Sequence, residues 1–234
     1  PFLCEDRTQA ERLVNSEFAR EISMDSLKSG ATILGIGDAG GFRQFSNSVR
    51  MIRRPEDLRG LKMRSNGMDT INKTLEALGA EVMTVPYNDL YMALKAGTID
   101  GQENPWVNSS GMRFYEVQKY FTEVNYQFHP EPFYVNTRWY ESLPREYQEI
   151  LEECTQEMMK ENNRLIDENE VQAMENIRAN AEIYTLSSEE RQAFVEATQV
   201  VYEEYMENGL LTRDELARMK RIIRGEEEQD YPYR

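Results

Sequence analysis

A long segment free of helix breakers constrains the fold more than any other feature of this sequence. Neither proline nor glycine occurs from residue 145 to residue 181, and large apolar residues such as Ile150, Met158 and Leu165 recur near helical spacing. An unbroken helix over this segment would be about 55 Å long at a rise of roughly 1.5 Å per residue, which exceeds one compact lobe. The segment therefore predicts a helix that joins two lobes.

Apolar and polar runs alternate along the rest of the chain as helix, strand, helix, strand, so the sequence predicts an α/β fold. Predicted helices cover residues 8–29, 67–80 and 87–97, with a short helical turn within 53–60. Predicted strands cover residues 31–36, 61–65, 81–86, 98–104, 120–127 and 131–138. Two capping boxes, Ser187 with Glu190 and Thr212 with Glu215, predict the starts of two later helices. An acidic, aromatic tail follows Gly225.

Charge and composition exclude several classes of partner. The formal net charge of −15 argues against nucleic acid and against anionic membrane surfaces, because either would be approached against repulsion. No apolar run of about 18 residues exists, so the chain is not expected to span a membrane. We expect no signal peptide in this sequence, which begins with the apolar "PFLC" rather than Met, a start typical of the interior of a domain. We therefore expect that the natural N-terminal segment is absent.

No familiar catalytic or metal-binding set is present. Cys4 and Cys154 are far apart in sequence, and His129 is the only histidine, so neither a zinc site nor a redox motif is expected. The sequence has no G-x-S-x-G elbow, P-loop or H-E-x-x-H. We expect no catalytic residue, no metal and no cofactor.

The glycines of "ATILGIGDAGGFRQFSNSVR" raise a rival hypothesis, because Gly35, Gly37 and Gly40 spell the G-x-G-x-x-G of a dinucleotide-binding turn. Such a turn must run into a helix whose N-terminus holds the pyrophosphate. The residues that follow Gly41 look extended instead, so a nucleotide-dependent enzyme is the disfavoured alternative. A helix beginning at Gly40 would support it, and a strand there would remove it.

The positive signal lies in two arginines and an amide. Arg43 precedes an extended polar segment, Arg64 ends a short strand, and Asn104 ends another strand before a proline. Ligands of α/β lobes bind at strand ends, and an arginine there can form a bidentate pair of hydrogen bonds with a carboxylate. For an isolated arginine, a surface ion pair is the commoner role.

Several segments together resemble a known family. They are "PFLCED", "GFRQFSNS", "RRPEDLRGLKMR", "LEALGAEVMTVPYNDLYMALKAGTIDGQENP", "YEVQKYF" and "WYESLPREYQEIL", and they extend from Pro1 to about Ile223. In this combination the chain resembles the periplasmic solute-binding proteins of tripartite ATP-independent periplasmic (TRAP) transporters. The resemblance implies a two-lobed periplasmic binding protein fold, an extracytoplasmic (periplasmic) location and a TRAP membrane permease as partner.

The resemblance also assigns lobes and site residues. Lobe I would comprise residues 1–41 plus 130–169, lobe II residues 42–129 plus 170–223, and a tail residues 224–234. Family members clamp an organic acid between lobes. By position, Arg64 resembles the arginine that pairs with the ligand carboxylate, Arg43 the supporting arginine, and Asn104 the amide that completes the site. Weaker candidates for walls and hydroxyl contacts are Gln102, Trp106, Ser65, Asn66, Phe133 and Asn136.

The chain departs from the family pattern at three places. Cys4 replaces a usual aromatic residue, so it alters either a wall of the ligand site or core packing. The segment "SNGMD" follows the key arginine where Val-Pro is more usual, and we expect Ser65, Asn66 and Asp69 either to contact ligand hydroxyls or to cap a helix. The family carries roughly 85 to 90 further residues before "PFL", and their absence would leave sheet edges unpaired.

The ligand itself stays open. The polar neighbours of Arg64 favour a hydroxylated acid such as a uronate or aldonate, and a C4-dicarboxylate, a keto acid, sialic acid or an ectoine-like zwitterion remain alternatives. A dicarboxylate would require a second cationic group at the far end of the site. Delivery of the ligand to a sensor rather than a permease is a further alternative.

Overall fold

The structure is a computed structural model, and it describes residues 1–227. The strands are β1 (Ala31–Asn47), β2 (Lys62–Ser65), β3 (Glu81–Thr84), β4 (Gly101–Pro105), β5 (Tyr120–Asn136) and β6 (Glu182–Thr185). The α-helices are α1 (Arg7–Val14), α2 (Glu17–Asp25), α3 (Asp69–Ala77), α4 (Leu90–Ala96), α5 (Trp106–Gly111), α6 (Thr137–Ser142), α7 (Arg145–Arg178), α8 (Ser188–Ala197), α9 (Gln199–Glu207) and α10 (Arg213–Ile223). Four short 3-10 helices lie at Ser26–Ser29, Pro55–Leu58, Tyr87–Asp89 and Phe114–Glu116.

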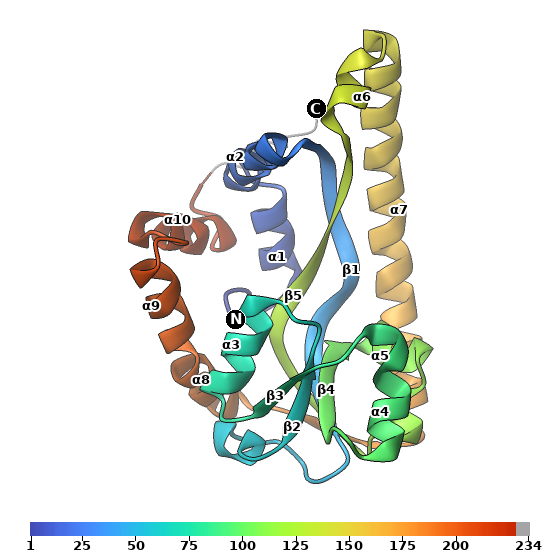
Figure 1. Ribbon diagram of the computed structural model, residues 1–234, viewed down its shortest axis with the longest axis vertical. Coiled ribbons are helices and arrows are strands. Elements are labelled where there is room, and N and C mark those ends of the chain that lie inside the picture. Colours follow the sequence, from blue (N-terminus) through green and yellow to red (C-terminus); the bar gives the residue numbers. More distant parts are fainter. Residues whose placement is uncertain (228–234) are drawn as a thin grey trace. The chain divides into compact units, whose positions relative to one another are not determined.

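The predicted long helix is confirmed. Helix α7 runs without interruption through 34 residues, and Figure 1 shows it as one continuous element. Pro144 precedes it, which is common because proline is favoured at the start of a helix and disfavoured in its interior. The chain divides into two compact units, and α7 belongs to both, since the division falls between Asn169 and Glu170.

The units differ from the expected lobes at Pro1–Leu3, at residues 128–129 and after Arg213. Unit 1 comprises Pro1–Leu3, Phe42–Gln127 and Glu170–Arg213, whereas unit 2 comprises Cys4–Gly41, Phe128–Asn169 and Asp214–Arg234. The first residues join unit 1 because the Phe2 amide donates to the Tyr126 carbonyl at 2.5 Å and the Phe2 ring packs in the core. Helix α10 joins unit 2 because Arg218 pairs with Glu21 and lies 5.3 Å from the Phe18 ring centroid.

Unit 1 is built on a six-stranded sheet in the order β3-β2-β4-β1-β5-β6. Strand β2 is parallel to both β3 and β4, and β5 is parallel to β6, whereas β1 is antiparallel to β4. The register between β1 and β4 aligns Arg43 with Pro105 and Phe45 with Glu103. The side chains of these two strands are thereby fixed beside each other.

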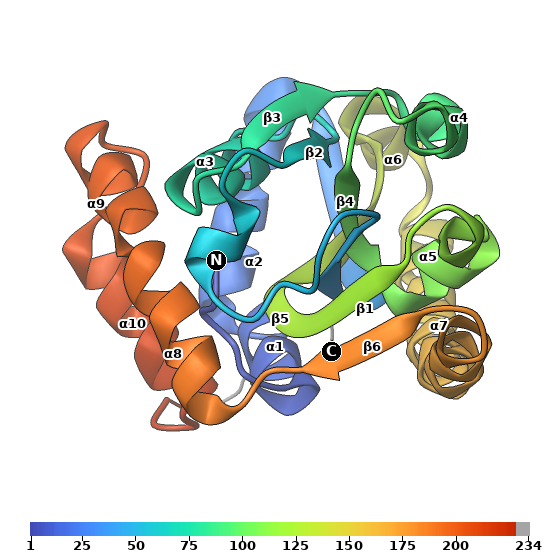
Figure 2. The same cartoon turned by 90° about the horizontal axis from the view of Figure 1, so that it is seen from below.

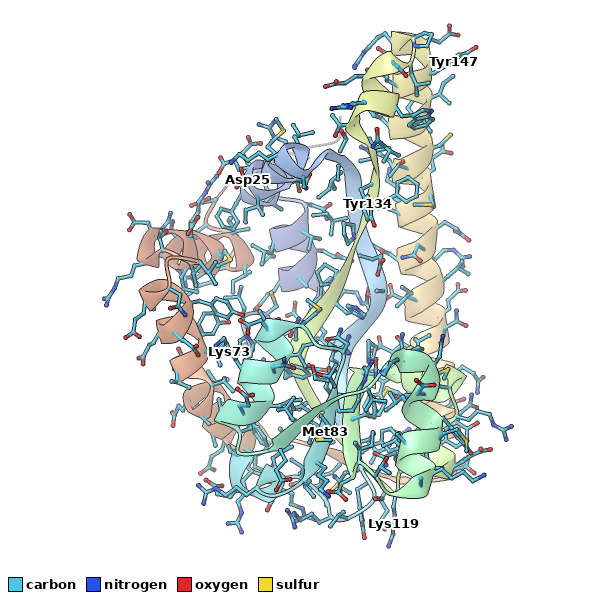
Figure 3. The ribbon with its side chains drawn as sticks, viewed as in Figure 1. Asp25, Lys73, Met83, Lys119, Tyr134 and Tyr147 are labelled. Carbon is cyan, nitrogen blue, oxygen red and sulfur yellow. The ribbon has the colours of Figure 1, made fainter. Side chains whose placement is uncertain are left out.

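Helices cover both faces of this sheet and bury a separate apolar core on each. One core gathers side chains from β1, β2, β5, α3 and α8, and the other gathers side chains from β5, α4, α5 and α7. Figure 2 shows α3 and α8 on one side of the strands and α4 and α5 on the other. Along β5 the alternation of a strand sends Phe121 to one core and Val124 with Tyr126 to the other. Outside the sheet, Lys73 on α3, labelled in Figure 3, forms an ion pair with Glu204 on α9.

In unit 2 the glycine-rich part of β1 packs closely on α7. A Cβ at Gly35 would lie 2.8 Å from Met159 Sδ, so only glycine allows this approach without a shift of the methionine. The Asn162 side chain donates to the Asp38 carbonyl at 2.7 Å. Gly35 thus serves helix packing, whereas a Cβ at Gly37 would make only ordinary contacts, the nearest at 3.6 Å.

Several predicted elements differ from the structure. The helix expected over 8–29 is two helices, because Ser16 caps α2 by accepting from the Ala19 amide at 3.2 Å. The strands expected at 120–127 and 131–138 are the single strand β5, and the strand expected at 31–36 continues to Asn47. Three helices rather than two follow β6. Most of the expected tail, residues 228–234, lies outside the described residues.

Candidate functional site

Arg64 is a buried cation at the end of β2. The strand lies between β3 and β4, and Arg64 is only 3% exposed. Its Nε donates to the Val85 carbonyl at 2.9 Å, and its guanidinium carbon lies 5.9 Å from the ring centroid of Tyr87. Within residues 1–227 it forms an ion pair with no carboxylate. Burial lowers the pKa of Arg64, and the charge of Glu103 offsets this only in part.

Arg43 is also buried, but its charge is matched. Its Nε and Nη2 donate to the two carboxylate oxygens of Glu103, and Nη2 donates to the Glu103 carbonyl at 3.0 Å. The Tyr126 hydroxyl donates to the same carboxylate. Burial disfavours a charged arginine, but the charges and hydrogen bonds of Glu103 and Tyr126 together outweigh it and raise the pKa of Arg43. Burial and the Glu103 charge likewise raise the pKa of Tyr126.

The cluster therefore carries one uncompensated positive charge among the described residues. Arg43 and Glu103 neutralise each other, whereas Arg64 has only a backbone carbonyl and an aromatic face as partners. A buried cation in that state is costly unless an anion joins it. The arrangement is suited to one carboxylate of a ligand.

Asn104 lies beside Arg43, near the end of β4. Its Oδ1 accepts from Arg43 Nη2 at 3.3 Å, and its Nδ2 donates to Gln102 Oε1 at 2.5 Å. Strand β4 pairs with both β1 and β2, so the topology brings residues from three segments of the chain together. Arg64 acts electrostatically on the same group, since its pKa responds to Glu103 and Arg43.

The weaker candidates divide into three kinds. Gln102 is buried in a hydrogen-bond chain, and Trp106 packs in a core with its ring centroid 6.1 Å from that of Phe121. Ser65 and Asn66 accept from the amides of Gly67 and Met68, so both stabilise the turn before α3 rather than cap the helix itself. The remaining two, Phe133 and Asn136, belong to unit 2, where Asn136 caps α6.

Sequence reasoning missed Glu103, Tyr126 and Tyr87. Glu103 had a signal, because it stands in the buried strand "GQENP" immediately before Asn104, and a buried carboxylate requires a cation. Tyr126 and Tyr87 had none, since aromatic residues in strands and short helices are most often core residues.

The backbone conformation at Gly40 contradicts the hypothesis of a nucleotide-binding turn. Gly40 and Gly41 lie inside β1, which continues to Asn47, so no helix begins at these glycines. Both have positive φ, and both of their amides donate to Asp38 Oδ1. Their glycine conformation thus serves a bend in a strand. The described chain also contains no group of three or more His, Cys, Asp or Glu side chains arranged to hold a metal ion.

None of the helices within residues 1–227 combines the length and the apolar character needed to cross a bilayer.

Comparison with a family model gives one match over most of the chain. The model described as bacterial extracellular solute-binding protein, family 7, matches residues 1–208. A curated relative, the C4-dicarboxylate-binding periplasmic protein DctP of Vibrio cholerae, is 30% identical over 88% of this chain and 61% of its own length. The chain spans 53% to 61% of the length of curated relatives of this kind.

Solved structures show the same architecture. A TRAP periplasmic solute-binding protein from Ralstonia eutropha H16 with bound (S)-2-acetolactate has a TM-score of 0.89 at 30% identity, over 96% of this chain and 73% of that one. A second, from Sulfitobacter with bound β-D-galacturonate, has a TM-score of 0.86 at 26% identity over the same shares.

Proposed function

The chain belongs to the bacterial extracellular solute-binding protein family 7, and from that membership we propose that the protein binds a carboxylate-bearing small molecule through Arg64. It acts as the extracytoplasmic, periplasmic subunit of a TRAP transporter and is not an enzyme. The observation that carries the proposal is the buried Arg64 guanidinium, which pairs with no carboxylate among the described residues.

Each residue of the cluster has a part in this proposal. Arg64 donates a bidentate pair of hydrogen bonds to the ligand carboxylate, because a planar guanidinium matches that geometry. Asn104 adds a donor from its amide. Arg43 supports them, since its charge is held by Glu103 and its Nη2 fixes Asn104 Oδ1.

Ligand binding drives transport by selecting one conformation. We propose that the ligand stabilises a closed form of the two-lobed protein over an open form, because only differential affinity shifts such an equilibrium. The closed form is the one that the membrane permease recognises. Of the weaker candidates, we propose Ser65, Asn66, Phe133 and Asn136 as contacts outside the carboxylate.

A sugar acid is the proposed class of ligand. One uncompensated positive charge matches one carboxylate, and the Sulfitobacter protein, 26% identical, has β-D-galacturonate bound. The Vibrio cholerae relative is named for C4-dicarboxylates and the Ralstonia eutropha protein has (S)-2-acetolactate bound, so dicarboxylates and keto acids belong in the same test.

A thermal-shift screen of the protein tests the proposal. The panel contains uronates, aldonates, C4-dicarboxylates, keto acids, sialic acid, ectoine and nucleotides. A ligand at 100 times its dissociation constant stabilises the folded state by about 2.7 kcal/mol, which raises Tm by several degrees. A shift with a monocarboxylic sugar acid that disappears in Arg64→Ala is the expected result. A shift with nucleotides alone would overturn the proposal, and delivery to a sensor is distinguished by which partner the liganded protein captures.

A further inference from the structure

We propose that Gln118, through Ser46 and Gln102, sets the direction in which the Asn104 amide points its donor. The inference rests on the proposed function, because it concerns the group that Asn104 presents to the ligand carboxylate. The four side chains form an unbroken chain of hydrogen bonds, here called the amide relay, and all four are at most 4% exposed. Solvent therefore does not compensate for a broken link.

The far end of the relay has a fixed direction. Gln118 Nε2 donates to two backbone carbonyls, that of Asp100 at 3.2 Å and that of Val117 at 3.1 Å. A carbonyl oxygen only accepts, so Gln118 must keep its nitrogen on that side. Its Oε1 is thereby turned toward Ser46 as an acceptor.

This direction passes through Ser46 to Gln102. The Ser46 hydroxyl donates to Gln118 Oε1 at 3.2 Å, so its oxygen is left to accept from Gln102 Nε2 at 2.7 Å. The second hydrogen of Gln102 Nε2 is directed to Ser109 Oγ at 3.4 Å. Both donors of Gln102 are engaged, and its Oε1 is available only as an acceptor for Asn104.

At the near end, Asn104 is held by both of its polar atoms. Nδ2 donates to Gln102 Oε1 at 2.5 Å, and Oδ1 accepts from Arg43 Nη2 at 3.3 Å. The second hydrogen on Nδ2 has no partner within residues 1–227. A carboxylate only accepts hydrogen bonds, so a site for one needs this hydrogen.

Reversal of the amide relay would remove the preference of the site for a carboxylate. If Gln102 turned over, its Nε2 would face Asn104 Nδ2, and Asn104 would relieve that contact only by turning its oxygen toward Gln102, at the cost of its hydrogen bond from Arg43. The ligand would meet a site with one donor fewer, and a carboxylate would lose a charge-assisted hydrogen bond. Gln118 and Ser46 are therefore positioning residues: they set the preference of the site for a carboxylate without contacting the ligand. Gln102 likewise positions Asn104 and does not contact the ligand.

The test compares each acid with its primary amide: D-galacturonate with D-galacturonamide, D-glucuronate with D-glucuronamide, D-gluconate with D-gluconamide, and succinate with succinamate. Titration calorimetry of the wild type gives the ratio of acid to amide affinity for the pair that binds best. The same ratio is then measured in Gln118→Met, which keeps side-chain length but has no donor and only a weakly accepting sulfur, and in Ser46→Ala. Thr122→Val is the matched control, since it removes a buried hydroxyl of unit 1 that donates to the Ile52 carbonyl outside the relay.

We expect the ratio to fall by about tenfold in Gln118→Met and Ser46→Ala, as for one lost hydrogen bond to a charged group, and to stay unchanged in Thr122→Val. A merely structural role would weaken the acid and the amide by the same factor, so an unchanged ratio in whichever relay variants fold overturns the inference and leaves the proposed function standing. Absence of acid binding by the wild type overturns the proposed function and the inference together.

Discussion

Glu103 holds the guanidinium of Arg43 by both its side chain and its backbone. The carboxylate accepts from Nε and Nη2, and the carbonyl accepts from Nη2 at 3.0 Å. Arg43 therefore has a matched charge and a fixed orientation, whereas Arg64 keeps its charge for a ligand. This difference between two buried arginines is the basis of the proposed site.

Removal of the Glu103 charge should destabilise the protein strongly. Glu103→Gln leaves Arg43 buried without a counter-charge, and breaking a buried pair in this way costs about 3–5 kcal/mol. Urea unfolding measures the loss. The same exchange at Glu182, which forms an exposed pair with Lys119 at 3.9 Å, should leave the urea midpoint almost unchanged. Equal effects of the two exchanges would contradict the buried pair.

Gly101 should tolerate no side chain. A Cβ there would contact the Ser46 carbonyl oxygen and would lie 2.6 Å from Met63 Sδ and 2.8 Å from Asn47 Cβ. Because a backbone atom is among these neighbours, we expect Gly101→Ala to cost about 1–3 kcal/mol or more in thermal unfolding. Gly111→Ala is the control, since no atom lies within 4 Å of its added Cβ. A Gly101→Ala variant as stable as the control would show that β4 does not lie as close to β1 and β2 as described.

The capping box of α8 should make stability depend on pH. The hydrogen bond from the Ser187 amide, followed by that from the Tyr184 hydroxyl, lowers the pKa of Glu190 below its ordinary value of 4.5. A carboxyl with a lowered pKa stabilises the fold at pH values above 4.5, and that contribution disappears as pH falls through the lowered value.

The difference in urea midpoint between wild type and Glu190→Gln should therefore be present at neutral pH and vanish in acid. Glutamine still suits the capping box, so the exchange isolates the charge. A difference of the same size at both pH values would contradict the linkage.

Local signals in the sequence were enough to predict much of the fold. The absence of helix breakers predicted α7, and Ser187 with Glu190 predicted the start of α8. The split between α1 and α2 was missed, because Ser16 in the middle of an apolar pattern gives no sign that it will cap a new helix. The extension of β1 to Asn47 follows from pairing with β4, which is a tertiary effect.

Three residues of the candidate site, two arginines and an amide, were predictable from the sequence, whereas Glu103 was missed. Arg64 and Asn104 stood near predicted strand ends and Arg43 stood before an extended polar segment, and the family resemblance pointed to the same three residues. Gln118 had no such signal, because its partners Ser46 and Asp100 are distant in sequence and meet it only in the folded sheet. The roles of Gln118 and Ser46 in the carboxylate site stay predictions.

The most direct test of the proposed site is a calorimetric titration of the wild type and Arg64→Lys with the acid that binds best in the panel. Lysine keeps the charge but lacks the planar fork, so we expect its affinity to be weaker by about tenfold or more. Arg64→Ala, which removes the charge as well, should lose about 3–5 kcal/mol of binding free energy. Equal affinity of Arg64→Lys and wild type would contradict a bidentate carboxylate pair at Arg64.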